Sequence, residues 1–193
     1  GAVVPPDPHV DRLDEREEEL KRLLSDRIGG IEMQSLAEVV LDETFFLEMT
    51  LNAGLGETQA EIGSIMLLDP ATDELEIVIS RGLSDEVVKT TRIAVGEAIA
   101  GYVAQQKKPL LVADIESEPR FAGVSQVRNR RTSFICVPII GRDRVLGVMN
   151  ANNKAGGGAF TNRDLAVMEW LAGRAAHFLE SLSILGASSS GAI

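Results

Sequence analysis

Residues 144–164 read RVLGVMNANNKAGGGAFTNRD. The stretch begins with an apolar run from Val145 to Met149, which predicts a buried strand. Three glycines at 156–158 indicate a turn, because glycine adopts the backbone angles that turns require. Thr161 and Asp164 then stand three residues apart, the spacing at which a hydroxyl and an acid cap the start of a helix. The stretch therefore predicts a strand that passes through a glycine loop into a helix.

The helix after this stretch has two distinguishable sides. Apolar residues recur at helical spacing on the side expected to face the core: Leu165, Met168, Ala172, Ala175, Leu179 and Leu182. The second side carries Val167, Trp170, Arg174 and His177. It either covers a sheet edge or forms a dimer face, and both interpretations stay open.

Two hairpins are predicted upstream and within the same stretch. Alternating apolar residues flank the turn signal at 69–73, and residues 134–140 pair with 145–150 across a second turn. A short helix is expected at 98–106. These elements predict an α+β fold, with an antiparallel sheet of about six strands, N- and C-terminal helices on one face, and a pocket under short helices and loops on the other.

The N-terminal third is predicted to be helical. A capping box at Ser35–Glu38 starts a helix that runs to about Ala53, with Gly54 as its left-handed terminator. Residues 11–31 are charge-rich, with sparse leucines near a heptad seam, which fits either a short coiled coil or a solvated helix. We therefore expect a disordered tail at 1–10, a signalling or coiled-coil helix at 11–31, one domain at 32–185 and a disordered tail at 186–193.

Composition excludes several classes of function. The 193 residues carry 19 Lys and Arg against 29 Asp and Glu, a formal charge of -10, which disfavours nucleic acid and anionic membrane as partners. No apolar run approaches the about 18 residues that span a bilayer. Cys136 is the single cysteine, so no internal disulfide forms and a cytoplasmic location is expected. Because the chain starts with Gly1, we expect a piece cut from a longer protein.

The end of the glycine stretch resembles one family. Asn153, Lys154, Phe160 and Asp164 match the Asn-Lys, variable loop, Phe-x-x-x-Asp-Glu signature of the GAF domain, the small-molecule-sensing module of phosphodiesterases, adenylyl cyclases and bacterial signalling proteins. Leu165 stands where the final Glu would be. Further pieces match in order along the chain, so the resemblance covers roughly residues 36–182: residues 64–69, 96–104, 109–114 and 133–139.

The resemblance implies a GAF/PAS-like pocket between the sheet and the irregular stretch Ile115–Thr132. An arginine cluster in that stretch, at 120, 128, 130 and 131, suits a small anion, because guanidinium groups bind carboxylate or phosphate in bidentate fashion. Strand alternation and the resemblance together give the expected lining residues: Ser64, Met66, Ile99, Phe121, Arg128, Arg131, Ser133, Ile135 and Met149. Lys154 and Asp164 are expected to form a clamp between the strand end and the helix start.

Cyclic nucleotides fit this lining poorly. The resemblance keeps Ser64, Ile99 and Ala100 at positions expected near the base, but Ser80 and Arg81 replace an aromatic residue and an acid. Arg131 stands where a threonine is expected. A stacking surface and a carboxylate for guanine are therefore missing.

Enzymatic and cofactor functions lack the residues they need. The free methionine sulfoxide reductases, which are GAF enzymes, use several cysteines, and one cysteine cannot run their disulfide cycle. Bilin and haem need an accessible cysteine or a histidine in the cavity, whereas the two histidines are His9 and His177. Acids at 114, 116 and 118 are interpreted as solvated loop residues. We assign no metal, no cofactor and no catalytic residue.

The resemblance thus implies a non-catalytic regulatory GAF domain of a bacterial signalling protein, which senses a small molecule and relays the signal through its terminal helices. We expect the longer chain to hold an effector domain as well. The alternative is a dimerisation module without a ligand. In either case a parallel homodimer is expected, because apolar residues on both terminal helices exceed what one sheet face can cover: Leu13, Leu20, Leu24, Val167, Trp170 and Ile184.

Overall fold

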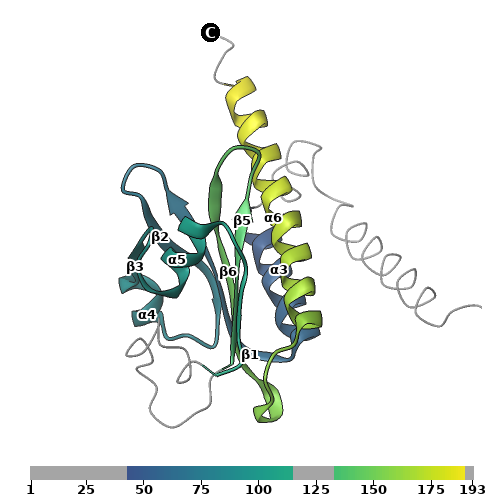
Figure 1. The fold of residues 1–193 in the computed structure, drawn as a ribbon. Helices are drawn as coiled ribbons and strands as arrows, with labels where there is room; N and C mark the ends of the chain where they lie inside the picture. Colours follow the sequence, from purple (N-terminus) through teal and green to yellow (C-terminus); the bar gives the residue numbers. More distant parts are fainter. Residues whose placement is uncertain (1–42, 115–132, 190–193) are drawn as a thin grey trace, which may run out of the picture. The chain divides into compact units, whose positions relative to one another are not determined.

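The structure is a computed structural model, and it describes residues 43–114 and 133–189. A six-stranded antiparallel sheet forms its centre, in the order β3-β2-β1-β6-β5-β4 (Figure 1). The strands are β1 (Ala60–Asp69), β2 (Glu74–Arg81), β3 (Arg92–Ala94), β4 (Leu110–Val112), β5 (Phe134–Ile140) and β6 (Val145–Lys154). The predicted α+β class and strand arrangement are confirmed.

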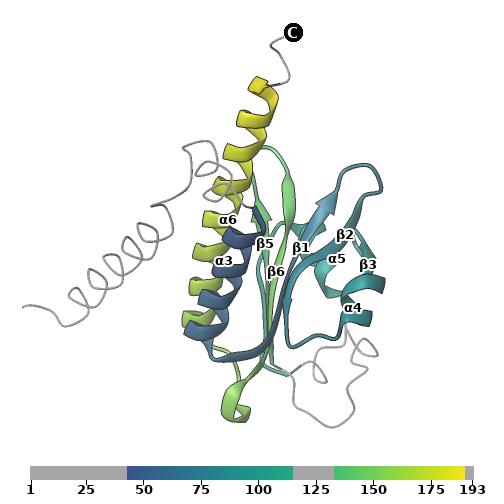
Figure 2. The same cartoon turned by 180° about the vertical axis from the view of Figure 1, so that it is seen from behind.

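Helices lie on both faces of this sheet. The long helices α3 (Glu43–Thr58) and α6 (Asn162–Ser189) cover one face side by side, and the short helix α5 (Ala98–Gln106) lies on the other (Figures 1 and 2). The short helix α4 (Asp85–Thr90) connects β2 to β3, and a 3-10 turn, η3 (Ala155–Gly157), connects β6 to α6. The helix at 98–106 has the predicted bounds.

Each face of the sheet has its own buried core. We call the face covered by α3 and α6 the helix side. There Ile65, Ile135 and Met149 pack against Leu51 of α3 and Met168 of α6. On the opposite side the apolar cluster is formed by Met66, Leu75, Ala100, Val103, Ala104, Val112, Phe134, Cys136, Val145 and Val148. Burial of apolar area on both faces supplies the main driving force for folding.

The predicted end of α3 is wrong. The helix continues through Gly54 to Thr58, and Gln59 is the residue with left-handed φ, at 56°. A Cβ atom at Gly54 would lie 2.8 Å from Met149 Cε and 3.0 Å from Met168 Sδ. Gly54 therefore allows α3 to approach the sheet and α6 closely and does not terminate the helix.

The start of that helix, at Ser35, and the helix expected at 11–31 lie outside the described residues. At the C-terminal end of the chain, α6 continues to Ser189, into the segment 186–193 that we expected to be a disordered tail. In the described part of the chain, no helix combines the length and apolar character needed to cross a bilayer.

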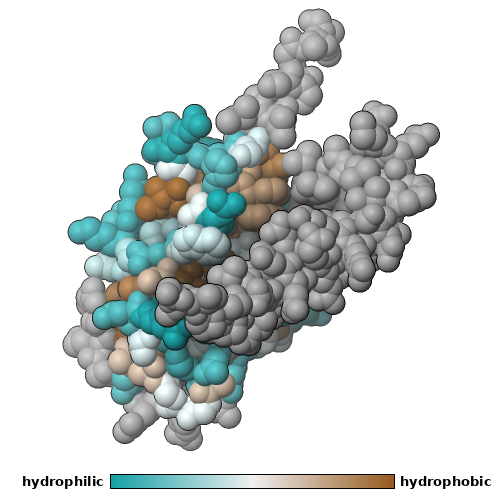
Figure 3. Space-filling model, turned by 90° about the vertical axis from the view of Figure 1, so that its right-hand side faces the viewer, coloured by the Kyte–Doolittle hydropathy of each residue, from teal (hydrophilic) through white to brown (hydrophobic). Residues whose placement is uncertain are grey.

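The outer surface of the helix layer carries exposed apolar side chains. Trp170 of α6 is 66% exposed, and Phe45 and Met49 of α3 are also exposed. Figure 3 views the molecule from this side, and apolar patches interrupt its hydrophilic surface. Val167, expected beside Trp170 on the second side of the helix, packs against the helix-side core instead. Val167 and Trp170 are the apolar residues expected at a dimer face whose side chains the structure describes. Of these two, Trp170 is the exposed one.

Candidate functional site

A short polar row crosses the sheet face that lies opposite α3 and α6. The strand register places Ser64 of β1 between Ser80 of β2 and Asn150 of β6. Ser64 Oγ accepts a hydrogen bond of 3.1 Å from Asn150 Nδ2, and the serine is only 6% exposed. We call Ser80, Ser64 and Asn150 the polar row. It continues into Cys136 of β5, which pairs with Asn150.

The rest of this face is apolar. Met66 and Val148 follow the polar row on the same side of β1 and β6 and belong to the buried cluster under α5. Ile99 of α5 packs against that cluster. Three of the predicted lining residues, Ser64, Met66 and Ile99, therefore share the sheet face expected to carry the pocket. An apolar surface with few polar groups is typical of small-molecule sites.

The predicted placement of Ile135 and Met149 is wrong. Both are fully buried in the helix-side core, where they pack with residues of α3 and α6. Successive strand residues point to opposite faces. Since Cys136 and Asn150 face α5, their neighbours Ile135 and Met149 must face the long helices.

Ser133 serves a structural contact. Its hydroxyl donates to the carbonyl oxygen of Val112 at 3.0 Å and accepts from the backbone N–H of Phe160 at 2.8 Å. The residue is 2% exposed. It therefore ties β4 and the start of β5 to the segment before α6. The hydroxyl of this predicted lining residue is engaged by main-chain groups.

The remaining predicted ligand residues, Phe121, Arg128 and Arg131, lie outside the described residues. The same is true of the whole cover segment from Ile115 to Thr132. The described residues therefore include only the part of the predicted lining that lies on the sheet and on α5.

Lys154 and Asp164 form a close ion pair at the β6–α6 junction. Lys154 Nζ lies 2.6 Å from Asp164 Oδ2, and the aspartate side chain is 8% exposed. The same oxygen accepts from the backbone N–H of Thr161 at 2.7 Å, and the Asp164 N–H contacts Thr161 Oγ1 at 3.4 Å. The capping box and the salt bridge, which we considered as separate roles, thus occur together.

Burial raises the pKa of the Asp164 carboxyl, but hydrogen bonds from Lys154 and Thr161 lower it by more. The net pKa lies below the ordinary value. A carboxylate held in this way stays charged at physiological pH and complements the helix dipole at the start of α6.

The chemistry of Cys136 is that of a core residue. Its side chain is fully buried, and burial raises the pKa of its thiol far above the ordinary range. The thiolate is the reactive form of cysteine, so this environment suppresses nucleophilic and redox chemistry. Among the residues that the structure describes, no group of three or more acids, histidines or cysteines could hold a metal ion.

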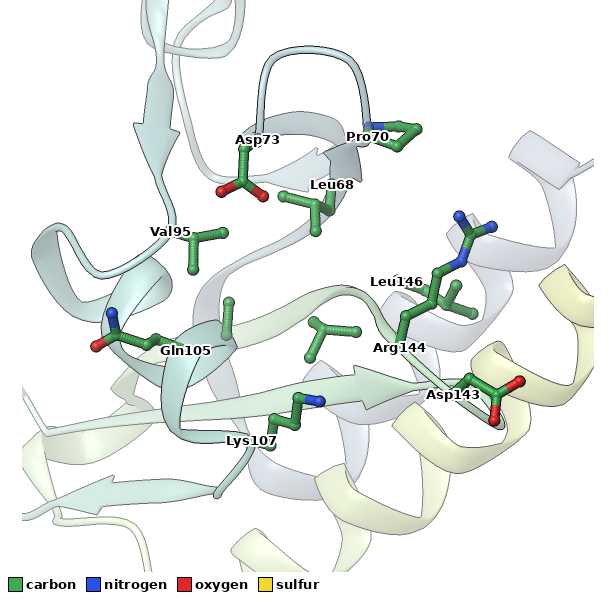
Figure 4. A pocket seen from close by; sticks show the side chains of 11 residues that line it. Leu68, Pro70, Asp73, Val95, Gln105, Lys107, Asp143, Arg144 and Leu146 are labelled. Atoms are coloured by element: carbon green, nitrogen blue, oxygen red, sulfur yellow. The ribbon is translucent and has the colours of Figure 1, made fainter.

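The sequence did not predict a hollow of about 440 Å³ at another place in the fold. It lies where the β1–β2 turn, the end of α5 and the β5–β6 turn meet (Figure 4). Its walls come from four segments of the chain, at 68–73, 95, 104–107 and 143–146, so no local pattern could have revealed it. The local signals that were visible are the turn acid Asp73 and the charged residue Lys107 after a helix.

Comparisons with known proteins agree with this architecture. The family model of the GAF domain matches residues 40–180. The Nif-specific regulatory protein of Herbaspirillum seropedicae is 30% identical over 136 residues, which cover 66% of this chain and 25% of that protein. The chain thus spans about a quarter of the length of this relative.

Solved structures match over most of the chain. The GAF domain from the Acinetobacter phosphoenolpyruvate-protein phosphotransferase has a TM-score of 0.64 at 19% identity, covering 88% of this chain and 95% of that one. The free methionine-R-sulfoxide reductase from Neisseria meningitidis has a TM-score of 0.61 at 23% identity, covering 76% and 83%. At these identities the likeness shows the fold alone.

This chain belongs to the GAF domain family. Its matched relatives include bacterial regulatory proteins. The family resemblance read from Asn153, Lys154, Phe160 and Asp164 is confirmed.

Proposed function

We propose that this chain is a non-catalytic regulatory GAF domain of a bacterial, cytoplasmic signalling protein, and that it binds a small molecule over the polar row and transmits binding to α6. The observation that carries the proposal is the hydrogen-bonding capacity left in the polar row. Among the described residues, the Ser64 hydroxyl proton and Asn150 Oδ1 have no protein partner. Ser64 is buried and Asn150 is half-buried. Since buried polar groups are normally paired, the unused donor of Ser64 and the unused acceptor of Asn150 are available to a ligand.

A route from the polar row to α6 supports the relay. Asn150 lies on β6, and β6 ends at Lys154, which holds Asp164 in the first turn of α6. The helix then runs for 28 residues. A ligand that displaces β6 by a small distance would therefore displace the start of α6. The expectation of an anionic ligand rests on Arg128 and Arg131, which the described residues do not include.

Calorimetry tests the ligand proposal. The whole chain is titrated with cyclic GMP, cyclic AMP and small carboxylates, and native mass spectrometry looks for a molecule retained from cells. For a ligand that binds, Asn150→Ala is expected to weaken affinity by about tenfold, since one good hydrogen bond contributes ~1–1.5 kcal/mol. Asn52→Ala is the matched control, because Asn52 is exposed on α3. Binding that Asn150→Ala leaves unchanged would place the ligand elsewhere.

A dimerisation module is the second candidate function. The 66% exposure of Trp170 on α6 favours it, because large aromatic residues are enriched at interfaces. Sedimentation of the whole chain at tens of micromolar tests this candidate, with Trp170→Glu expected to shift a dimer towards monomer. A dimer together with no retained or titratable ligand would favour this function over sensing.

Sulfoxide reduction is the enzymatic alternative, and the buried, single Cys136 argues against it. An assay with free methionine sulfoxide and a thiol reductant is expected to give no turnover above buffer. Turnover that Cys136→Ala abolishes would contradict the non-catalytic proposal.

A further inference from the structure

The hollow at the end of α5 lies apart from the polar row. None of the three polar-row residues lines it. Its volume of about 440 Å³ falls within the range of small-molecule sites, roughly 300–1,000 Å³. An inference about this hollow therefore does not rest on the function proposed for the polar row.

The hollow has an apolar floor and a charged rim. Leu68, Ala104 and Val145 are partly or fully buried at the floor. The rim carries Asp73 on one side and Lys107 on the other, and Figure 4 shows the two side chains on opposite sides of the hollow. Opposite charges are thus held apart across an apolar surface.

These rim charges are not used to hold the fold together. The ion pairs found among the described residues are Arg81–Glu48, Arg92–Glu76 and Lys154–Asp164. None of them includes Asp73, Lys107 or the other two charged residues that line the hollow, Asp143 and Arg144. The rim charges are therefore available to a ligand.

The backbone gives a second, independent observation. Asp73 has φ of 59° and Lys107 has φ of 54°, both in the left-handed region. Two of the five non-glycine residues with positive φ in the described ranges thus face one hollow. Glycine is the residue that usually occupies the position after a helix, where Lys107 stands. Aspartate tolerates this conformation in turns, whereas lysine seldom adopts it, so a lysine kept at position 107 indicates a use for its side chain.

We propose that this hollow binds a small zwitterion with an aliphatic body, of the amino-acid and short-peptide class. The ligand ammonium lies at the Asp73 carboxylate, its carboxylate lies at Lys107 and Arg144, and its aliphatic groups cover Leu68 and Val145. A simple anion would be repelled by Asp73 and Asp143, and a simple cation by Lys107 and Arg144. A zwitterion satisfies both ends of the rim.

A ligand bound at this site would affect α6 through the contacts of the β5–β6 turn. Arg144 belongs to the β5–β6 turn, whose Arg142 N–H donates to the carboxylate of Glu180 on α6. A second hollow, lined by Leu179 and Glu180, shares Arg144 with the first. A ligand at the rim would therefore contact the turn that α6 holds.

The test compares four probes on the whole chain by calorimetry and thermal shift. L-leucine and L-leucyl-L-leucine are the zwitterions, 4-methylpentanoate lacks the ammonium of leucine, and 3-methylbutylamine lacks its carboxylate. At least one zwitterion is expected to bind at millimolar concentration or below and to raise Tm. Each single-charge analogue is expected to bind more weakly by about tenfold or more.

Variants locate the binding. Lys107→Gly suits the left-handed backbone and Asp73→Asn tolerates it, so neither threatens the fold. Each is expected to weaken zwitterion binding by about tenfold or more, whereas Lys108→Ala, an exposed cation that does not line the hollow, should leave it unchanged. No binding of either zwitterion, equal binding of the single-charge analogues, or affinity unchanged in Lys107→Gly and Asp73→Asn would overturn the proposal.

Discussion

The β6–α6 junction and the hollow at the end of α5 both gather charged residues, but they use them in opposite ways. At the junction, Asp164 Oδ2 alone accepts from Lys154 Nζ, from the Thr161 N–H and from the Thr161 hydroxyl. At the hollow, no ion pair found among the described residues involves Asp73 or Lys107. Pairing within the fold therefore separates residues that stabilise the domain from residues that are free to act on something else.

The largest expected effect comes from the junction. Ser133→Ala removes the hydroxyl that serves Val112 and Phe160, and it leaves a buried carbonyl and a buried N–H without that partner. The free energy of unfolding is expected to fall by about 2–4 kcal/mol, measured by urea denaturation. Ser181→Ala is the control, because this hydroxyl lies in an exposed contact on α6. A loss of stability no greater than that of the control would show that the Ser133 hydroxyl does not stabilise the fold.

Asp164→Asn should cost less, about 2 kcal/mol near neutral pH, because Asn keeps part of the capping contact but loses the charge. The folded pKa of Asp164 is lowered, so its contribution is present above the unfolded pKa of about 3.9 and is lost as pH falls through the folded value. The stability difference between wild type and variant should therefore shrink in acid. A difference that stays constant from neutral pH to pH well below that range would contradict this account.

Lys154→Met is expected to lower stability by about 1 kcal/mol, because the ion pair is largely screened from solvent but Thr161 still holds the acid. Arg92→Met provides the contrast. Its partner Glu76 is 41% exposed, so the loss should stay within about 0.5 kcal/mol. Both losses are measured by urea denaturation. Equal losses of stability in the two variants would mean that burial of the Lys154–Asp164 pair does not increase its contribution to stability.

The smallest expected effect lies at the hollow and has the opposite sign. Lys107→Gly relieves a left-handed backbone and removes no ion pair, so stability should rise by a few tenths of a kcal/mol to about 1 kcal/mol. Thermal unfolding without any ligand measures this. A marked loss of stability would show that Lys107 belongs with the structural residues after all.

Local patterns were sufficient for most elements of the fold. The hairpin around Asp69 and Asp73 closes as predicted, with the Asp73 N–H donating to the Asp69 carbonyl oxygen at 2.9 Å. Gly54 shows the limit of such patterns. A glycine near a helix end is compatible with termination or with close packing, and the side chains of Met149 and Met168, which are distant in sequence, show that close packing is the reason here.

The pocket-facing side of β5 could not be read from its own residues. Ile135, Cys136 and Val137 are all fully buried, so both faces are apolar and the strand has no alternation. A register shift in the β1–β2 pairing adds a second obstacle. It leaves Val78 between the partners of Ile65 and Met66, with its side chain exposed. Which residues face α5 depends on this pairing, which the sequence alone does not reveal.

The clamp at Asp164 also fixes the rotational phase of α6. An α-helix turns by about 100° and rises about 1.5 Å per residue, so Ser189, 25 positions beyond Asp164, is displaced by roughly 37 Å along the axis. Because Lys154 holds the first turn, the direction in which any later position points is set at the junction. One inserted residue would rotate everything beyond it by about 100°, whereas seven would restore the direction to within about 20°. The length of α6 therefore determines the direction in which the end of the helix points as well as its distance from the junction.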